Sequence, residues 1–354
     1  MIDQPFWRNQ RVLLTGHTGF KGTWLSLWLE QMGADVFGLA LPPQTAPSMF
    51  SMLQPIAKQV SFLGDIRDPE VVASAVREAR PTVAVHMAAQ PLVRRSFREP
   101  IETYGTNVMG TAHLLDALRR VSGLKAILVV TTDKVYRNDS RGGSFVESDP
   151  LGGHDPYAAS KVATEFVVQS YSASYFAPIG VPIATARAGN VIGGGDWAED
   201  RLIPDLWRAV QAGKPLQLRN PQSTRPWQHV LEPLSGYLAY VERLARGEQI
   251  PRALNFGPLP GDALTVAEVA EAMLAAILSP HGWVSEQPRT PHPTESQYLA
   301  LDPALAQATI GWQPRLTPAE ALRWTAEWYN AVAKGANART LSLDQLRRYR
   351  ALAA

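Results

Sequence analysis

Residues 15–22 read TGHTGFKG, a glycine-rich turn that gains its meaning from the segments on either side. Before the turn, residues 11–14 form a short apolar segment that predicts a β-strand. After it, apolar residues recur at helical spacing over residues 23–29. A strand, a glycine-rich turn and a helix in this order are typical of a binding site for the pyrophosphate of a dinucleotide.

The three glycines of the turn have separate roles in such a site. Gly16 permits the tight turn, Gly19 lets backbone amides approach the pyrophosphate, and Gly22 allows close helix packing. The N-terminus of the following helix favours an anion. The alternative, a turn that only joins a strand to a helix, is weakened by the flanking pattern. We therefore predict that the dinucleotide contacts Gly16, His17, Thr18, Gly19, Phe20, Lys21 and Gly22.

A second motif lies in the same half of the chain. Tyr157 and Lys161 are four residues apart in a segment of helical pattern, so they share one helix face. A lysine charge lowers the pKa of a nearby phenol, and the phenolate can take a proton from a sugar hydroxyl. The pair alone is common by chance, and it gains weight from the glycine-rich turn.

The first half of the chain alternates between strand and helix patterns. Strands are predicted at residues 35–41, 59–63, 83–87, 125–131 and 183–188, and helices at residues 69–79, 106–120 and 157–172. This alternation predicts an α/β fold, a Rossmann-type doubly wound parallel sheet with helices on both faces. Ligands of such folds bind at the C-terminal edge of the strands.

The sequence changes character after about residue 190, where prolines and tryptophans follow three consecutive glycines. We predict a dinucleotide-binding Rossmann domain over residues 1–190 and a smaller mixed lobe for the substrate over residues 191–354. The lobe is interleaved with the sheet, because residues 253–256 return to it. Helices are predicted at residues 265–278 and 318–332, and the basic tail at residues 343–350 reads as a solvated helix.

Composition fits a soluble enzyme. The 354 residues are 45% hydrophobic and 19% charged, and the formal net charge of +2 gives no reason to expect nucleic-acid or membrane partners. With 0 cysteines, disulfides, thiolate zinc sites and cysteine nucleophiles are excluded, and no metal site is predicted. The first eight residues show no signal-peptide pattern, and no uncharged apolar stretch reaches transmembrane length, so we expect a cytoplasmic protein.

Together these motifs resemble the extended short-chain dehydrogenase/reductases and, more narrowly, the CDP-glucose 4,6-dehydratases of bacterial dideoxysugar and O-antigen synthesis. The resemblance covers essentially the whole chain, and RAGNVIGGGDW at residues 187–197 is among its longest and most specific stretches. The other matching stretches are residues 15–24, 64–68, 86–94, 106–111, 132–134 and 225–230.

The resemblance implies a bound NAD that is reduced and reoxidised within one turnover of CDP-glucose. Tyr157 would take the proton of the C4 hydroxyl while the C4 hydride moves to the nicotinamide. Thr132 would hydrogen-bond that hydroxyl, and Lys161 would hold the nicotinamide ribose. The product would be CDP-4-keto-6-deoxyglucose.

Elimination of water from the 4-keto intermediate needs an acid and a base. Asp133 is the candidate acid at the C6 oxygen, and Lys134 is the candidate base at C5. Two alternatives stay open: Lys134 stabilises the enolate electrostatically, or the two residues form a surface salt bridge at a strand end.

Further contacts follow from the same resemblance. Asp65 and Ile66 would flank the adenine, and Ala88, Ala89 and Gln90 would line the cofactor; the alternatives are a capping aspartate and a simple strand-end turn. Arginine suits phosphate oxygens, so part of the predicted substrate set would grip the pyrophosphate. This set is Arg94, Asn190, Arg201, Arg219, Arg225 and His229, of which His229 is equally well read as a buried histidine.

One departure concerns the choice of cofactor. NAD-binding folds usually place an acid near the end of the second strand to hold the ribose 2′-hydroxyl. Residues 39–45 read LALPPQT, which contains neither an acid nor an arginine. NAD therefore rests on the resemblance, and NADP is not excluded.

The motifs leave two other functions to consider, a 4-epimerase and a non-enzymatic sensor, and they also bear on the oligomeric state. A nucleotide-sugar 4-epimerase would need Thr132, Tyr157 and Lys161 but no acid–base pair for elimination, so Asp133 and Lys134 argue against it. A non-enzymatic NAD-binding sensor would have no need of the tyrosine and lysine. Extended family members often dimerise through two helices, here residues 106–120 and 157–172, so we expect a homodimer or a dimer of dimers.

Overall fold

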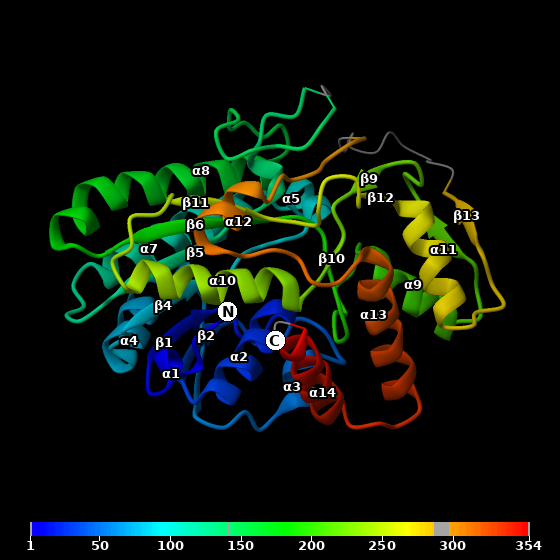
Figure 1. The fold of residues 1–354 in the computed structure, drawn as a ribbon, viewed down its shortest axis with the longest axis horizontal. Helices are drawn as coiled ribbons and strands as arrows, with labels where there is room; N and C mark the ends of the chain where they lie inside the picture. Colours follow the sequence, from blue (N-terminus) through cyan, green and yellow to red (C-terminus); the bar gives the residue numbers. More distant parts are fainter. Residues whose placement is uncertain (1, 140–141, 287–296, 353–354) are drawn as a thin grey trace.

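A sheet of seven parallel strands forms the centre of the molecule (Figure 1). The structure, a computed structural model, describes residues 2–139, 142–286 and 297–352. The strands run in the order β3-β2-β1-β4-β5-β6-β11. Their bounds are β1 Arg11–Thr15, β2 Asp35–Ala40, β3 Gln59–Leu63, β4 Val83–His86, β5 Ala126–Val130, β6 Ile183–Ala188 and β11 Ala253–Phe256. The predicted doubly wound α/β fold is therefore confirmed.

The central strands are apolar on both faces because helices cover both. Val12 and Leu14 of β1 join one hydrophobic cluster, and Leu13 between them joins the other. Helices α4 (Pro69–Ala79), α7 (Gly110–Leu118) and α8 (Pro156–Tyr171) cover the second face. Helices α2 (Phe20–Met32) and α10 (Leu231–Ala245) cover the first (Figure 1). The side chains of Trp24 and Trp28 of α2 are fully buried there.

The helix expected at residues 106–120 differs from the observed one. The helical segment begins earlier, as α6 (Pro100–Tyr104), and passes through a π-helical turn, η1 (Gly105–Met109), into α7. The backbone carbonyl of Asn107 in this turn accepts hydrogen bonds from the hydroxyls of Thr111 at 2.7 Å and Thr164 at 2.8 Å. These side-chain donors serve the widened turn, and helical periodicity alone does not show them.

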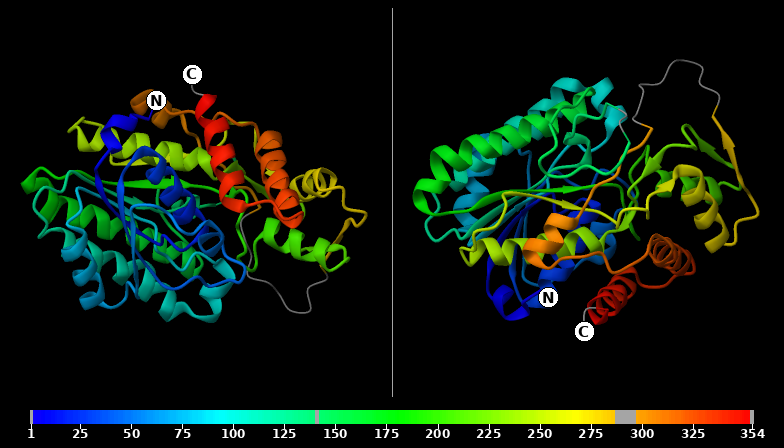
Figure 2. Two further views of the ribbon diagram at one scale, coloured as in Figure 1. Left: turned by 90° about the horizontal axis from the view of Figure 1, so that it is seen from below. Right: turned by 45° about the horizontal axis from the view of Figure 1, so that its top comes forward.

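A smaller lobe stands at one end of the sheet (Figure 2). It contains three short two-stranded pairs and two amphipathic helices, and α13 packs against it. The elements are β7 Val191–Ile192, α9 Leu202–Gln211, β8 Leu216–Leu218, β9 Thr224–Arg225, β10 Gln228–His229, β12 Leu264–Thr265, α11 Val266–Ala276, β13 Trp283–Ser285 and α13 Pro318–Ala333. Because α10 and β11 build on the sheet, residues on both sides of position 190 contribute to it.

The basic tail is less exposed than the sequence suggests. Helix α14 (Ala338–Ala351) packs against α2, α13 and the short α3 (Met49–Leu53), and it buries Leu346 and Tyr349. Arg347, Arg348 and Arg350 are exposed, whereas Arg339 at the start of the helix pairs with the largely buried side chain of Glu30 of α2, so the prediction of a solvated helix is wrong for the inner face. The remaining short elements are α1 Gln4–Trp7, α5 Val93–Arg98, η2 Asp133–Val135, η3 Ser172–Phe176, η4 Ala177–Ile179 and α12 Ala304–Ile310. Within the described ranges, no helix combines the length and the apolar character needed to cross a membrane.

Candidate active site

A cavity of about 330 Å³ opens between the C-terminal edge of the sheet and the lobe. Its wall includes the segment after β5, the start of α8, the helix α5 and the strand β8. The sequence-predicted residues that line it are Phe20, Lys21, Arg94, Thr132, Asp133, Lys134, Tyr157, Asn190, Arg201, Arg219 and Arg225. Residues far apart in the sequence thus meet at one site.

Tyr157 stands at the first turn of α8, where its side chain is almost fully buried. Asp155 caps this helix by accepting a hydrogen bond from the amide of Ala158 at 2.8 Å, and Pro156 fits its first position. Burial has the largest effect on the Tyr157 phenol and raises its pKa to about 12. The hydrogen bond with Thr132 is the next largest effect and opposes this rise. The expectation that Lys161 lowers this pKa is wrong for the protein alone, because desolvation dominates.

Lys161 lies one turn further along α8, behind the cavity wall. Its ammonium donates a hydrogen bond to the backbone carbonyl of Val130 at the end of β5, at 3.1 Å. Burial lowers the pKa of Lys161 to about 8, against a smaller opposing effect of Glu165. The helical spacing of Tyr157 and Lys161 that the sequence predicted is present.

Asp133 is the most unusual group of the cavity wall. Its side chain is 2% exposed, and its Oδ1 accepts a hydrogen bond from the hydroxyl of Thr132 at 2.9 Å. Its Oδ2 is buried and has no hydrogen-bond partner among the described residues. Lys134 is more open, and its Nζ lies 4.0 Å from Oδ1. Because a buried polar atom without a partner is costly, the free oxygen suits a group whose partner is a ligand.

The glycine-rich turn has the geometry that a dinucleotide needs. Gly16 adopts a left-handed φ of 78°, and a Cβ there would lie 2.8 Å from the amide nitrogen of Ala88. A Cβ on Gly22 would clash with the carbonyl oxygen of Gly16. Gly19 starts α2, and no side chain caps this helix. The turn therefore offers an open, uncapped helix N-terminus, which fits the pyrophosphate of NAD.

The side chains of the turn point in different directions. The imidazole of His17 packs over Gly38 and lies 2.5 Å from the hydroxyl of Ser61, away from the cavity. The hydroxyl of Thr18 donates to the carbonyl of Leu41 at 2.8 Å. Phe20 and Lys21 face the cavity instead. Burial, followed by the charges of Arg201 and Lys161, lowers the pKa of Lys21 to about 7.

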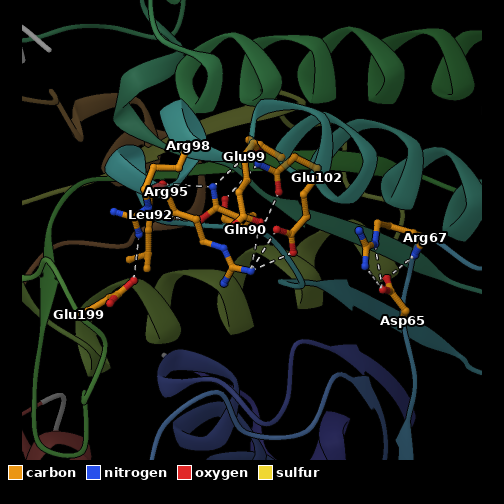
Figure 3. A network of polar contacts seen from close by, with 11 residues as sticks. Asp65, Arg67, Gln90, Leu92, Arg95, Arg98, Glu99, Glu102 and Glu199 are labelled. Atoms are coloured by element: carbon orange, nitrogen blue, oxygen red, sulfur yellow. Dashed lines mark hydrogen bonds and ion pairs between the residues drawn. The ribbon is translucent and has the colours of Figure 1, made fainter.

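The predicted adenine-flanking residues follow β3 at the edge of the sheet, and the predicted cofactor-lining residues follow β4, with β1 and β2 between the two strands. Asp65 forms an ion pair with Arg67 at 2.5 Å (Figure 3), and Ile66 is buried against Gly110. The side-chain amide of Gln90 donates to the hydroxyl of Thr103 at 2.9 Å and to the carbonyl of Leu92 at 3.1 Å. This side chain therefore holds its own loop in shape, while the backbone of Ala88 packs closely against Gly16.

The predicted substrate-binding arginines already have partners within the protein. Arg201 pairs with Asp196 at 3.0 Å, and Arg94 and Arg219 both pair with Asp200 at 3.1 Å. Arg225 is buried and donates to the carbonyl of Thr224 at 2.8 Å. Sequence reasoning missed the acidic partners, whose only signal was their place beside RAGNVIGGG.

His229 does not reach the cavity. Its ring is fully buried between Trp24 and Trp324, with ring centroids 6.3 Å and 5.8 Å apart. Burial lowers the pKa of His229 to about 3, so the ring is neutral. This packing favours the reading of a buried histidine.

A buried polar network behind Lys161 was also missed. Glu165 receives two hydrogen bonds from the guanidinium of Arg187 at 2.9 Å, one from the hydroxyl of Thr131 at 2.6 Å, and one from that of Thr185 at 2.9 Å. Glu165 lies four residues after Lys161, so this spacing was the available signal. The network ties α8 to β5 and β6 directly below the catalytic candidates.

Comparisons with known proteins agree with this site. The family model described as GDP-mannose 4,6 dehydratase matches residues 13–325. A CDP-glucose 4,6-dehydratase of Salmonella typhimurium is 46% identical over 341 residues, which cover 95% of this chain and 94% of that protein.

Two solved structures share the fold. An epimerase of Methanothermobacter thermautotrophicus has a TM-score of 0.81 at 26% identity, covering 94% of this chain and 95% of its own. A dTDP-glucose 4,6-dehydratase variant of Streptomyces venezuelae, solved with NAD bound, has a TM-score of 0.75 at 26% identity and covers 90% and 96%. With a family model matched over most of its length and a relative 46% identical along nearly all of it, this chain belongs to the GDP-mannose 4,6-dehydratase family of nucleotide-sugar-modifying enzymes.

Proposed function

We propose that the protein is an NAD-dependent CDP-glucose 4,6-dehydratase that forms CDP-4-keto-6-deoxyglucose. The observation that carries the proposal is the buried Asp133, one carboxylate oxygen of which has no partner among the described residues, beside Tyr157 and Thr132 in one cavity. The similarity to the Salmonella typhimurium CDP-glucose 4,6-dehydratase supports the choice of CDP-glucose.

The proposed reaction uses four side chains of the cavity wall in turn. Tyr157 accepts the proton of the C4 hydroxyl, which Thr132 holds in place by a hydrogen bond. Lys134 then removes the C5 proton, which the neighbouring 4-ketone acidifies. Asp133 donates a proton to the C6 oxygen, which leaves as water. NAD, when bound, would supply the redox chemistry by accepting the C4 hydride and giving it back at C6, while Lys134 returns a proton to C5, so the conversion is redox-neutral overall.

The cofactor site and the substrate site are proposed from neighbouring residues. The turn from Gly16 to Gly22 would hold the pyrophosphate of NAD, with Asp65 and Ile66 at the adenine and Ala88 to Gln90 alongside. Lys161 would hold the nicotinamide ribose. Arg94, Asn190, Arg201, Arg219 and Arg225 would hold the nucleotide-sugar from the lobe side of the cavity.

The 4-epimerase reading explains the site less well. Epimerisation returns the hydride to C4 and expels no water, so it gives no task to an acid at C6. Asp133 would then be a buried carboxylate with a free oxygen and no chemical role, which is costly. The sensor reading is weaker still, because both Tyr157 and Lys161 stand at the site.

We also propose that the chain forms a homodimer through α6, η1 and α8. These elements pack on one another and leave large apolar side chains exposed on their outer side. Ile101 is 83% exposed, Phe166 55% and Met109 51%. Exposed large apolar side chains on elements that pack together are typical of a protein–protein interface.

The decisive experiment supplies NAD together with CDP-glucose, UDP-glucose, dTDP-glucose or GDP-mannose and follows the alkaline absorbance of the 4-keto product. Product from CDP-glucose, and much less from the others, is expected. If bound NAD is demonstrated and none of the four sugars gives product, the dehydratase proposal fails and epimerisation is tested next. Product from another nucleotide-sugar would keep the chemistry and correct the base.

A further inference from the structure

Asp200 joins two arginines that come from opposite sides of the cavity. Its Oδ1 accepts a hydrogen bond from Nη1 of Arg94 at 3.1 Å and another from Nη1 of Arg219 at 3.1 Å. Arg94 lies on α5, next to the sheet, and Arg219 follows β8 of the lobe. A single carboxylate oxygen thus bridges the two parts of the molecule between which the substrate must bind.

The backbone at Asp200 is shaped for this task. Its φ is +58°, in the left-handed region, which aspartate tolerates better than most residues other than glycine. The side chain of Asp200 is 20% exposed, and those of Arg94 and Arg219 are 32% and 25% exposed. All three side chains line the cavity and are therefore accessible to a ligand from within it.

The charges around the cavity identify the ligand as an anion. The described side chains that line it include six basic groups, Lys21, Arg94, Lys134, Arg201, Arg219 and Arg225, and four acidic ones, Asp133, Asp196, Asp200 and Asp205. The cavity therefore keeps an excess of positive charge after its internal ion pairs are counted. A diphosphate ester, with a negative charge on each phosphate, complements that excess without displacing Asp200.

Asp200 takes one N–H donor from each arginine through the same oxygen. A guanidinium has five N–H donors, and each of these arginines gives one to Oδ1 of Asp200. Arg219 also lies 3.7 Å from Asp205 and 3.8 Å from Glu286, so without Asp200 it has other acids to turn toward. Arg94 and Arg219 would also repel each other at close range if the carboxylate between them lost its charge.

We propose that Asp200 is a positioning residue for the diphosphate of the substrate: it holds the guanidinium groups of Arg94 and Arg219 together so that both donate to phosphate oxygens. This inference rests on the proposed nucleotide-sugar substrate and deepens it. Asp200 touches neither the sugar nor the reacting atoms. Its contribution is to fix two flexible side chains before the ligand arrives, which reduces the ordering cost of binding.

The test compares Asp200→Asn with a matched neighbour, Glu199→Gln. Glu199 pairs with Arg98 at 3.2 Å in the same loop (Figure 3), but both side chains are more than half exposed and neither is part of the cavity wall. Binding of CDP and of CMP is measured by calorimetry, and turnover of CDP-glucose gives KM and kcat. The melting temperature of each variant reports on its fold.

For Asp200→Asn we expect KM for CDP-glucose and Kd for CDP to rise about tenfold, with kcat changed less than about threefold. The affinity for CMP should change much less, because the second phosphate is missing. Glu199→Gln should behave as the wild type. Asp200→Glu, which restores the charge one methylene further out, should recover part of the CDP affinity.

Three results would overturn the proposal. The first is Asp200→Asn binding CDP as tightly as, or more tightly than, the wild type, which would make Asp200 a competitor of the phosphate. The second is an equal loss of CDP and CMP affinity. The third is Asp200→Glu binding CDP no more tightly than Asp200→Asn. If Asp200→Asn does not fold, the ratio of the CDP and CMP affinities of Asp200→Glu decides alone. If the wild type binds CDP but does not convert CDP-glucose, the dehydratase proposal fails, while the CDP and CMP affinities still test the role of Asp200.

Discussion

Tyr157 must lose its proton in the proposed reaction, although burial, the largest influence, raises its pKa to about 12. Replacing it with phenylalanine keeps the ring and removes only the group that exchanges protons. We expect Tyr157→Phe to lower kcat with CDP-glucose by roughly 100-fold or more while NAD stays bound, because general-base catalysis typically contributes that much. Turnover and the NAD content of the purified variant measure the two effects. A variant that keeps most of its kcat would remove Tyr157 from the mechanism.

Lys161 gives the cofactor-free protein a defined pH dependence. Its pKa is 10.5 in the unfolded chain and about 8 in the folded one, so between these values the unfolded state binds more protons. The stability contributed by this group is therefore present at high pH and is lost as the pH falls through 10.5 toward about 8.

The variant Lys161→Met isolates that contribution. Its free energy of unfolding, measured by urea denaturation without NAD, is compared with that of the wild type at several pH values. From pH 7 to pH 9.5 we expect the wild type to gain about 2 kcal/mol relative to Lys161→Met. A difference between the two proteins that does not change with pH would mean that the folded state leaves the lysine pKa unshifted.

The glycine-rich turn can keep its conformation unchanged only if Gly22 has no side chain. We expect Gly22→Ala to cost about 1–3 kcal/mol of stability and to weaken NAD binding strongly, because its Cβ meets the backbone of Gly16. Gly282→Ala is the control, since nothing lies within 4 Å of a Cβ there. Thermal unfolding and NAD titration measure both effects, and equal behaviour of the two variants would contradict the prediction.

The helix α8 is anchored to the sheet by the buried pair of Glu165 and Arg187. Glu165→Ala leaves a buried guanidinium without its partner, and we expect a loss of about 3–5 kcal/mol. Asp344→Ala breaks an exposed pair with Arg347 and should cost less than about 1 kcal/mol. Chemical denaturation compares them. A small loss in Glu165→Ala would mean that Arg187 finds another partner, such as Tyr136, at 2.9 Å.

At this scale the sequence predicted the elements better than their contacts. The edge strand at Gln59–Leu63 and the buried strand at Ile183–Ala188 were found with the correct ends, because turn residues follow each of them. The π-helical turn was missed, because it depends on hydroxyls of Thr111 and Thr164 that meet the backbone of Asn107. The ion pair between Arg94 and Asp200, which are 106 residues apart, follows only from the packing of the lobe. His229 carried no local signal for its burial between tryptophans.

For the whole molecule, the apolar surface over α6, η1 and α8 predicts a dimer in solution. Ile101→Lys places a charge at the most exposed of these side chains, and a charge in an apolar interface without a partner is costly. We expect the variant to be monomeric by light scattering at concentrations where the wild type is dimeric. Its melting temperature should fall only by the amount that dissociation of the dimer causes, because the fold of each subunit is unchanged. Leu278→Lys is the matched control, since Leu278 is 88% exposed but follows α11 on the lobe. If both variants stay dimeric, the interface lies elsewhere; if the wild type is itself monomeric, the exposed apolar face needs another partner.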